Sequence, residues 1–127
     1  MHLKRILQKF DYKKSTKEIM ETKNCVYLIK CKNCSEIYIG QTSRELKLRL
    51  KEHKSSSYNS RVYDHILSRN HEIDFENVII LHVEKNKRVR EFKENWEINK
   101  HLLQSKRLMN TQLEKSTLPS QYYPFCN

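Results

Sequence analysis

Glycine is almost missing from this chain. The one glycine, Gly40, stands in a sequence of 127 residues, where an average composition would supply about nine. Gly40 comes directly after a β-prone stretch, so we infer that the backbone at this position needs a residue without a Cβ atom. Gly/Ser-rich linkers and internal repeats are missing too, and the length suits one compact domain.

Long apolar runs are also missing. No run approaches the roughly 20 residues of a membrane-spanning helix, and the first residues form no apolar signal core. We therefore expect no membrane partner and an intracellular protein in a reducing compartment. In such a compartment the four cysteines favour thiol chemistry or metal binding over disulfides.

Acidic residues are scarce relative to basic ones. The chain has 25 Lys and Arg against 15 Asp and Glu, a formal net charge of +10. An excess of this size favours a polyanionic partner, and nucleic acid is the usual one. A basic but merely solvated surface is the alternative. We expect a nucleic acid as the partner and no small-molecule substrate.

The apolar pattern predicts an α+β domain. Two short β-prone runs flank a loop and suggest a hairpin, and apolar residues at helical spacing predict helices further on. The expected order is β-β-α-α-β-α-α, a small antiparallel three-stranded sheet flanked by helices. The expected elements are strands at 26–29 and 37–39, a helix from its cap at 42 to about 54, a helix at 60–69, a strand at 73–83, and helices at 87–103 and 108–113.

The expected domain spans residues 25–115. Residues 1–24 form a basic, partly ordered lead-in, and residues 116–127 form an irregular tail in which Pro119 and Pro124 prevent regular structure.

Local signals indicate how the helices begin and which sides they bury. The segment from Thr42 to Glu45 has the pattern of a capping box, with Thr42 as N-cap. The residues expected to face the core in the first two helices are Leu46, Leu50, Val62 and Ile66.

Cys31 and Cys34 form a C-x-x-C pair in the predicted hairpin loop, with the spacing of a zinc knuckle. His65 and His71 bracket the end of a predicted helix and could supply the two further ligands of a structural Zn²⁺. A reduced pair without metal is an equal alternative. A thioredoxin-like redox role is disfavoured, because that motif begins a helix rather than lying in a hairpin.

Two tyrosines and a helical pair complete the candidates. Tyr27 and Tyr38 lie eleven residues apart in the predicted strands, where tyrosine is common as a packing residue. Arg49 and His53 are four apart and therefore share one helix face. Arginine is suited to holding a phosphate, although an arginine in a basic helix is often only solvated.

Together these residues resemble the GIY-YIG endonuclease core. The resemblance rests on Cys25-Val26-Tyr27, Tyr38-Ile39-Gly40, and the Arg and His one helical turn apart. It implies that Tyr27 activates the attacking water with support from Tyr38 and His53. It also implies that Arg49 holds the scissile phosphate.

The resemblance extends to the last predicted helices. It implies a metal-binding glutamate, Glu94, four residues before Ile98, and an asparagine, Asn110, that ends the core. A hard cation such as Mg²⁺ or Mn²⁺ would suit one carboxylate, because it keeps several waters. Helix geometry alone does not choose Glu94 over Glu91 or Glu97.

The cysteine and histidine pairs are similar to those of the GIY-YIG domain of Penelope-like retroelements. That subset implies cleavage that leaves a 3′-hydroxyl, from which a partner reverse transcriptase domain could copy its RNA, and a nuclear location. We therefore expect a metal-dependent DNA endonuclease. The alternative from another class is a catalytically silent, zinc-stabilised DNA-binding module.

Overall fold

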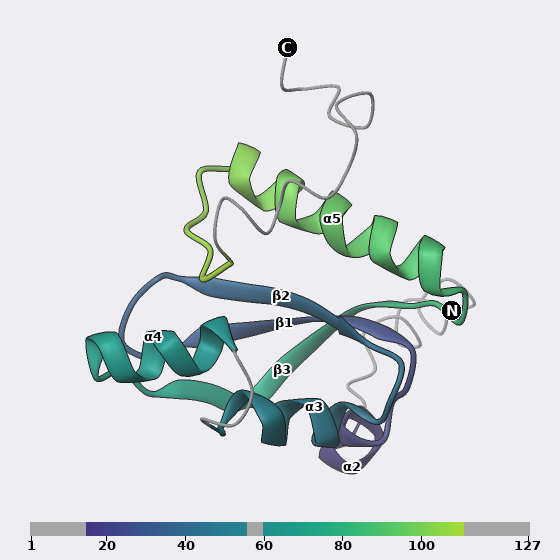
Figure 1. The fold of residues 1–127 in the computed structure, drawn as a ribbon, viewed down its shortest axis with the longest axis horizontal. Coiled ribbons are helices and arrows are strands. Elements are labelled where there is room, and N and C mark those ends of the chain that lie inside the picture. Colours follow the sequence, from purple (N-terminus) through teal and green to yellow (C-terminus); the bar gives the residue numbers. More distant parts are fainter. Residues whose placement is uncertain (1–14, 56–59, 111–127) are drawn as a thin grey trace, which may run out of the picture.

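The computed structural model describes residues 15–55 and 60–110, and every structural statement below refers to them. A three-stranded antiparallel sheet with strand order β2-β1-β3 forms its centre, and helices cover both faces (Figure 1). This confirms the predicted α+β class. The elements are α2 (Thr16–Met20), β1 (Cys25–Cys31), β2 (Ile37–Thr42), α3 (Leu46–His53), α4 (Arg61–Arg69), β3 (Ile73–Val83) and α5 (Lys87–Leu103).

The central strand β1 is buried on both sides. Its side chains alternate between the two faces of the sheet, so Tyr27 and Ile29 join one hydrophobic cluster while Val26 and Leu28 join another. The first cluster lies under α3 and α4 and contains Leu46, and the second lies under α5. Tyr27 therefore faces α3, on the side of the sheet opposite α5.

Helix α3 begins differently from the prediction. Its N-cap is Glu45, whose side chain makes no capping hydrogen bond. The hydroxyl of Thr42 instead accepts a hydrogen bond from the Arg44 backbone N–H at 3.1 Å. The predicted capping box is therefore wrong, because Thr42 is still the last residue of β2 and its hydroxyl closes the turn that follows. Leu46 and Leu50 are buried, as predicted.

Helix α4 begins as predicted. Ser60 is its N-cap and accepts hydrogen bonds from the backbone N–H groups of Val62 and Tyr63. Val62 is buried as expected, but Ile66 is only partly buried and packs against the edge of the cluster. The second buried residue of α4 is His65.

The predicted helix at 108–113 is wrong where the structure describes it, and residues 111–113 lie outside the described part. Leu108 forms a parallel bridge with Ile37. The N–H of Ile37 donates to the Arg107 carbonyl at 2.9 Å, and the N–H of Met109 donates to the Ile37 carbonyl at 2.7 Å. Strand β2 is at the sheet edge, so this segment covers backbone groups that a helix would leave unpaired.

Helix α5 has the predicted bounds but buries an unexpected face. The apolar residues whose spacing predicted it, Val89, Phe92, Trp96 and Leu103, are all exposed, and its buried residues are Arg90, Asn95, Glu97 and Ile98. The Glu97 carboxylate meets His82 Nε2 of β3 at 2.7 Å. Polar contacts thus hold much of α5 on the sheet.

The short helix α2 was not predicted. It is held at its start by Ser15, whose side chain accepts a hydrogen bond from the Glu18 N–H. None of the helices in the described ranges has the length and apolar character needed to cross a membrane.

Candidate functional site

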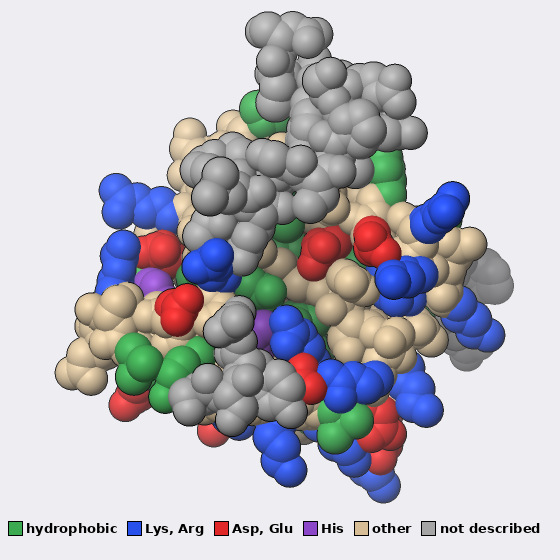
Figure 2. Space-filling view, in the orientation of Figure 1, with side chains coloured by type: hydrophobic (Ala, Val, Ile, Leu, Met, Phe, Trp, Pro, Cys, Tyr) green, Lys and Arg blue, Asp and Glu red, His purple; other side chains and the backbone are tan. Residues whose placement is uncertain are grey.

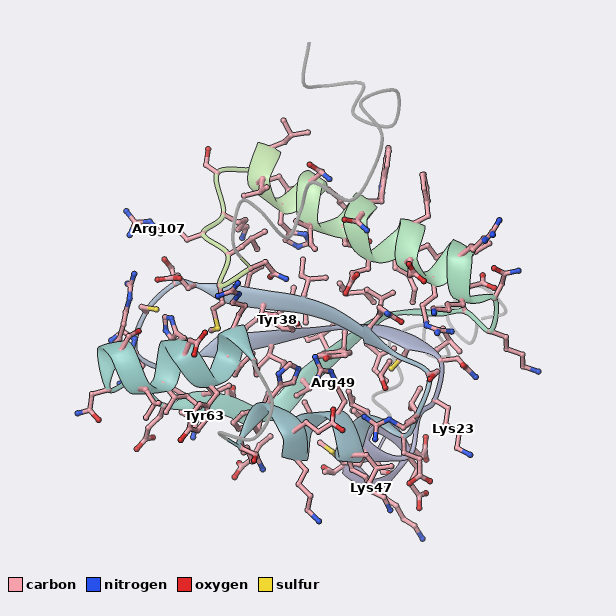
Figure 3. All side chains as sticks on the ribbon, in the orientation of Figure 1. Lys23, Tyr38, Lys47, Arg49, Tyr63 and Arg107 are labelled. Atoms are coloured by element: carbon pink, nitrogen blue, oxygen red, sulfur yellow. The ribbon has the colours of Figure 1, made fainter. Side chains whose placement is uncertain are left out.

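The two predicted tyrosines meet on one face of the sheet. Tyr27 of β1 pairs with Gly40 of β2, and Tyr38 lies two residues before Gly40 on the same strand. The two ring centroids are 6.4 Å apart. Tyr27 is fully buried, whereas Tyr38 is half-buried. In Figure 3, Tyr38 and Arg49 both lie in the central region between α5 and α3.

Gly40 is the residue that makes this pairing possible. A Cβ atom at this position would lie 2.7 Å from the Tyr27 hydroxyl oxygen and 2.7 Å from Cε2 of Tyr38. Both distances are far shorter than a carbon atom tolerates. The inference that this backbone needs a glycine is therefore supported: the missing Cβ leaves the space that the Tyr27 phenol occupies.

A buried hydrogen-bond chain connects Tyr27 to two helices. The Tyr27 hydroxyl lies 2.7 Å from Nε2 of His53, the last residue of α3. The other ring nitrogen, Nδ1, lies 2.6 Å from Oγ of Ser60. Ser60 was predicted to begin a helix but not to contact the site. Its capping serine signal was present in the sequence, yet only the fold places it against His53.

Burial keeps both rings of this chain neutral. Burial, followed by the neighbouring Tyr38, raises the pKa of Tyr27 well above its ordinary value, and Arg49 opposes the shift. Burial, followed by the positive charge of Arg49, lowers the pKa of His53 to about 3. Deprotonation of the Tyr27 phenol therefore requires additional positive charge at the site.

Arg49 lies close enough to Tyr27 and Tyr38 for its charge to act on both phenols. Its side chain is 27% exposed, and its Nη1 donates to Oε1 of Glu52 at 3.0 Å. Glu52 also forms an ion pair with Arg44 at 2.5 Å. The carboxylate thus holds two guanidinium groups together. Glu52 was not among the predicted site residues, although its position three residues after Arg49 was a visible signal.

Glu94 and Asn110 reach the site in different ways. Glu94 is half-buried on α5, and its charge contributes to raising the pKa of Tyr27, although burial is the main cause. Asn110 binds the backbone of Ile39: Oδ1 accepts from the N–H at 3.1 Å, and Nδ2 donates to the carbonyl at 2.9 Å. Both polar ends of this amide therefore hold the strand segment between Tyr38 and Gly40.

The four predicted metal ligands converge at the other end of β1. Cys31 Sγ lies 3.4 Å from His71 Nδ1, and Cys34 Sγ lies 3.5 Å from His65 Nε2. The two imidazole nitrogens are 3.2 Å apart, and all four candidate ligand atoms lie within 4.8 Å of one another. The hairpin position of the cysteines agrees with the prediction. The set could hold a metal ion.

The three shortest separations, 3.2, 3.4 and 3.5 Å, are close to those of a tetrahedral ion, and the atoms up to 4.8 Å apart would draw together on binding it. With bonds of about 2.0–2.1 Å to nitrogen and about 2.3 Å to sulfur, tetrahedral zinc holds its ligand atoms about 3.3–3.8 Å apart. Burial lowers the pKa of His65, which favours the neutral imidazole that a metal requires. The Glu36 carboxylate lies 3.7 Å from His65 Nδ1 and pairs with Arg69 at 2.8 Å. Glu36 thus lies on the side of the His65 ring that faces away from the cysteines, although 3.7 Å is longer than a hydrogen bond.

Basic side chains are spread over the face shown in Figure 2, with acidic side chains among them.

A comparison with protein-family models matches residues 23–107 to the model described as GIY-YIG catalytic domain. Searches of curated proteins and of solved structures found no significant match.

Replacement of Gly40 by alanine tests the packing at the tyrosine pair. We expect Gly40→Ala to destabilise the protein by about 1–3 kcal/mol, the cost of an extra methyl in a packed core. Urea unfolding measures this change. The penalty should be smaller in a Tyr27→Phe background, which removes the nearest oxygen, and unchanged in a Tyr38→Phe background, because Tyr38 makes its contact through the ring. Equal penalties in all three backgrounds would contradict the assigned contact.

The neutral state of His53 predicts a pH dependence of stability. In the unfolded chain His53 takes up a proton below about pH 6.5, whereas in the folded protein its pKa is about 3. The unfolding free energy is therefore undiminished by His53 above pH 6.5. It decreases as the pH drops from 6.5 toward 3, because the unfolded chain takes up a proton that the folded protein does not. Relative to His53→Gln, the wild type should lose about 1.4 kcal/mol of unfolding free energy per pH unit between about pH 6 and pH 4. A difference that does not vary with pH would show that His53 is freely protonated in the folded protein.

Proposed function

The chain belongs to the GIY-YIG catalytic domain family, and from this premise we propose that it is an endonuclease that hydrolyses DNA phosphodiester bonds with Mg²⁺ or Mn²⁺. Members of the family are metal-dependent nucleases. The observation that carries the proposal is the convergence of Tyr27, Tyr38, Arg49 and His53 around the one glycine of the chain.

The buried chain of hydrogen bonds supports a role in proton transfer. In the proposed reaction the Tyr27 oxygen orients the attacking water and takes its proton, while the phenol proton passes to Nε2 of His53. The resulting imidazolium donates from Nδ1 to the Ser60 hydroxyl, so the proton remains on His53. The P–O3′ bond breaks as the water oxygen binds phosphorus, and the leaving 3′ oxygen takes a proton from solvent. Tyr38, whose ring is 5.0 Å from the imidazole, supports the arrangement. Tyr27 is fully buried beside Arg49, and in the proposed reaction water reaches its oxygen once Arg49 has moved onto the phosphate.

Arg49 is proposed to bind the scissile phosphate. Its planar guanidinium offers paired donors to phosphate oxygens, and its present acceptor, Glu52, keeps Arg44 as a second partner when Arg49 leaves. A negative phosphate beside His53 would also raise the pKa that Arg49 now lowers, which favours proton uptake.

Glu94 is proposed to hold the catalytic cation, which when bound would stabilise negative charge on the phosphate. The structure adds a reason to prefer Glu94 over Glu97. The Glu97 carboxylate is buried and engaged by His82 at 2.7 Å, whereas the charge of Glu94 acts on Tyr27. Asn110 is proposed to keep the Tyr38–Gly40 strand segment in place beneath the phosphate.

Cys31, Cys34, His65 and His71 are proposed to bind one structural Zn²⁺. Four protein ligands complete a tetrahedral shell and leave no position for substrate, so this ion would stabilise the fold rather than take part in the reaction. It would join the β1–β2 hairpin to the end of α4 and the start of β3.

We further propose that the domain acts in a retroelement. A Cys pair between the tyrosine tripeptides and a His pair downstream, brought together as one cluster, support likeness to the Penelope-like form. In that role the domain would nick DNA in the nucleus and leave a 3′-hydroxyl, from which a partner reverse transcriptase could extend. Detection of a 3′-hydroxyl by extension of the nicked product with a polymerase tests this part separately.

Plasmid cleavage tests the nuclease function. Supercoiled plasmid should be nicked or cut with Mg²⁺ present, and left intact when Mg²⁺ is omitted or chelated by EDTA. Glu94→Ala should abolish this cleavage while the fold and DNA binding persist. Arg49→Ala should lose at least about 10²-fold in rate, the scale for one electrostatic stabiliser of a transition state. Glu91→Ala, on the same helix, is the matched control and should cut as the wild type does.

Two outcomes would contradict these assignments. A wild-type rate in Glu94→Ala would move the cation to another carboxylate. DNA binding by the wild type without cleavage at any Mg²⁺ or Mn²⁺ concentration would favour the catalytically silent, zinc-stabilised DNA-binding module.

Metal analysis tests the zinc site. Purified protein should contain about one zinc per chain, the stoichiometry of one four-ligand site. Cys34→Ser should lower both the zinc content and the melting temperature. Free zinc at about 1,000 times its Kd would add about 4 kcal/mol to the stability of the wild type. Cys126→Ser is the control and should keep its zinc, although Cys126 lies outside the described residues. If the purified wild type contains no zinc and its stability does not change in a strong chelator, the assignment of a zinc site is wrong.

A further inference from the structure

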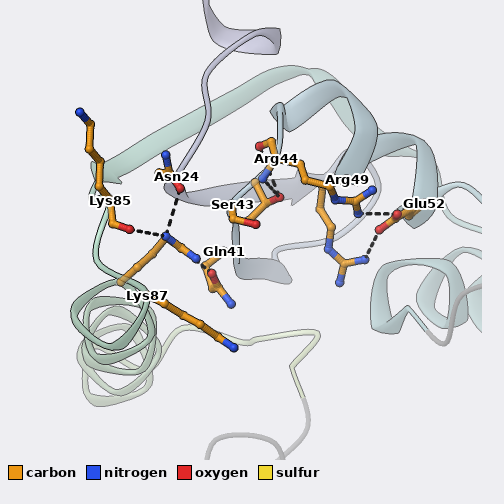
Figure 4. A pocket seen from close by; sticks show the side chains of 10 residues that line it. Asn24, Gln41, Ser43, Arg44, Arg49, Glu52, Lys85 and Lys87 are labelled. Atoms are coloured by element: carbon orange, nitrogen blue, oxygen red, sulfur yellow. Dashed lines mark hydrogen bonds and ion pairs between the residues drawn. The ribbon is translucent and has the colours of Figure 1, made fainter.

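A basic cleft lies beside the tyrosine site, at the end of the sheet where β1 begins and β2 and β3 end (Figure 4). Its volume is about 560 Å³, within the range of about 300–1,000 Å³ that is usual for ligand pockets. Its charged lining residues are five cations and one carboxylate: Arg44, Arg49, Lys85, Lys87, Arg90 and Glu52.

The one carboxylate does not neutralise this cleft. Glu52 is shared between Arg44 and Arg49, so its single negative charge is already divided between two guanidinium groups (Figure 4). The lysines at positions 85 and 87 are exposed at the rim. Five cations against one carboxylate leave the cleft with an excess of positive charge, which favours an anionic ligand.

Arg90 places a buried charge in the wall of the cleft. Its side chain is 3% exposed. Nε donates to Oε1 of Gln41 at 2.7 Å, and Nη1 donates to Oδ1 of Asn24 at 3.3 Å and to the Glu84 carbonyl at 3.1 Å. These acceptors are all neutral. The Glu84 carboxylate is near enough to feel the charge of Arg90 but is itself paired with Lys93 at 3.0 Å.

The position of Arg90 in α5 adds to the demand for an anion. The helix begins at Lys87, so Arg90 lies in the first turn, at the positive end of the helix dipole. A cation is disfavoured there, and burial disfavours it further unless an opposite charge is close. An anion in the cleft would relieve both costs.

We propose that the basic cleft binds a non-scissile backbone phosphate of the DNA strand that is cut, one or two nucleotides from the scissile phosphate. The inference rests on the proposed function for the identity of the anion. Arg49 lines the cleft and also acts on the two tyrosines, so a phosphate at Arg49 has its neighbours at the cleft. Phosphates of one strand follow each other at about 3.4 Å along the helix axis. The cleft thus fixes the register of the strand over Tyr27.

A pair of lysine substitutions tests the cleft without disturbing an ion pair. Lys85→Gln with Lys87→Gln removes two positive charges from the rim. Lys30→Gln with Lys32→Gln is the matched control: these lysines are also exposed and two residues apart, but they lie at the opposite end of β1. Thermal unfolding should show that both double variants fold as the wild type does.

The probe is a DNA duplex of one sequence with a single uncharged methylphosphonate linkage, moved one position at a time along each strand. Binding is measured without added Mg²⁺, and the cut position is mapped with Mg²⁺ on the unmodified duplex. For the wild type, one or two neutral linkages next to the cut should weaken binding about tenfold or more, the scale of one lost charge-assisted hydrogen bond.

The cleft variant should respond differently. Its binding to unmodified DNA should be weaker by about the same factor, and its slope of log K against log salt should fall by about one, as expected for one lost phosphate contact. The neutral linkages that weaken binding by the wild type should weaken binding by this variant less, because two of the five cations of the cleft are gone. The control variant should keep the wild-type pattern.

An unchanged linkage pattern in the cleft variant, or an equal loss of affinity in both double variants, would overturn the inference. The same experiment distinguishes this inference from the proposed function. If the wild type shows the cleft-dependent linkage effect but cuts no DNA, the phosphate site stands and the nuclease assignment is wrong. If the wild type cuts DNA but no neutral linkage next to the cut weakens its binding, the nuclease assignment stands and the phosphate site is wrong.

Discussion

The close contact between Tyr27 and Gly40 across the β1–β2 pair is the constraint on which the site depends. The phenol lies where a Cβ of residue 40 would be, and from there its hydroxyl reaches His53 at 2.7 Å. Since His53 ends α3 and contacts the cap of α4, the space left by the missing Cβ allows one hydrogen-bond chain to connect the sheet with two helices. Any side chain at position 40 would displace the ring on which the whole hydrogen-bond chain is built.

The sheet serves two different sites at the two ends of β1. The basic cleft and the tyrosine pair lie near the start of β1. There, cations stand next to neutral buried rings, and this arrangement is suited to a phosphate. Near its end, the Cys and His cluster ties the hairpin to α4. A metal ion at this cluster would stabilise a small domain with a thin apolar core, because its binding energy would add to the folding energy.

Several parts of the fold could be predicted because their signals are local. The dense Val and Ile run predicted β3, and the helical spacing of apolar residues predicted α5, both with the observed bounds. The spacing did not predict which side of α5 is buried, because Glu97 and Arg90 find partners on strands far away in the sequence. The segment after α5 escaped prediction for a similar reason: it is held by the open edge of β2.

The sequence by itself determined which residues could take part in the chemistry: one glycine two residues after a tyrosine, an Arg and His four apart, and a Cys pair and a His pair at recognisable spacing. Only the tertiary structure decided how they are used. It buried Tyr27 and His53 and thereby kept both neutral, engaged Glu97 with His82, and gathered cations from two distant stretches of the chain around one cleft. Residue type and spacing are local properties, whereas burial, pKa and charge balance depend on neighbours that only the folded chain brings together.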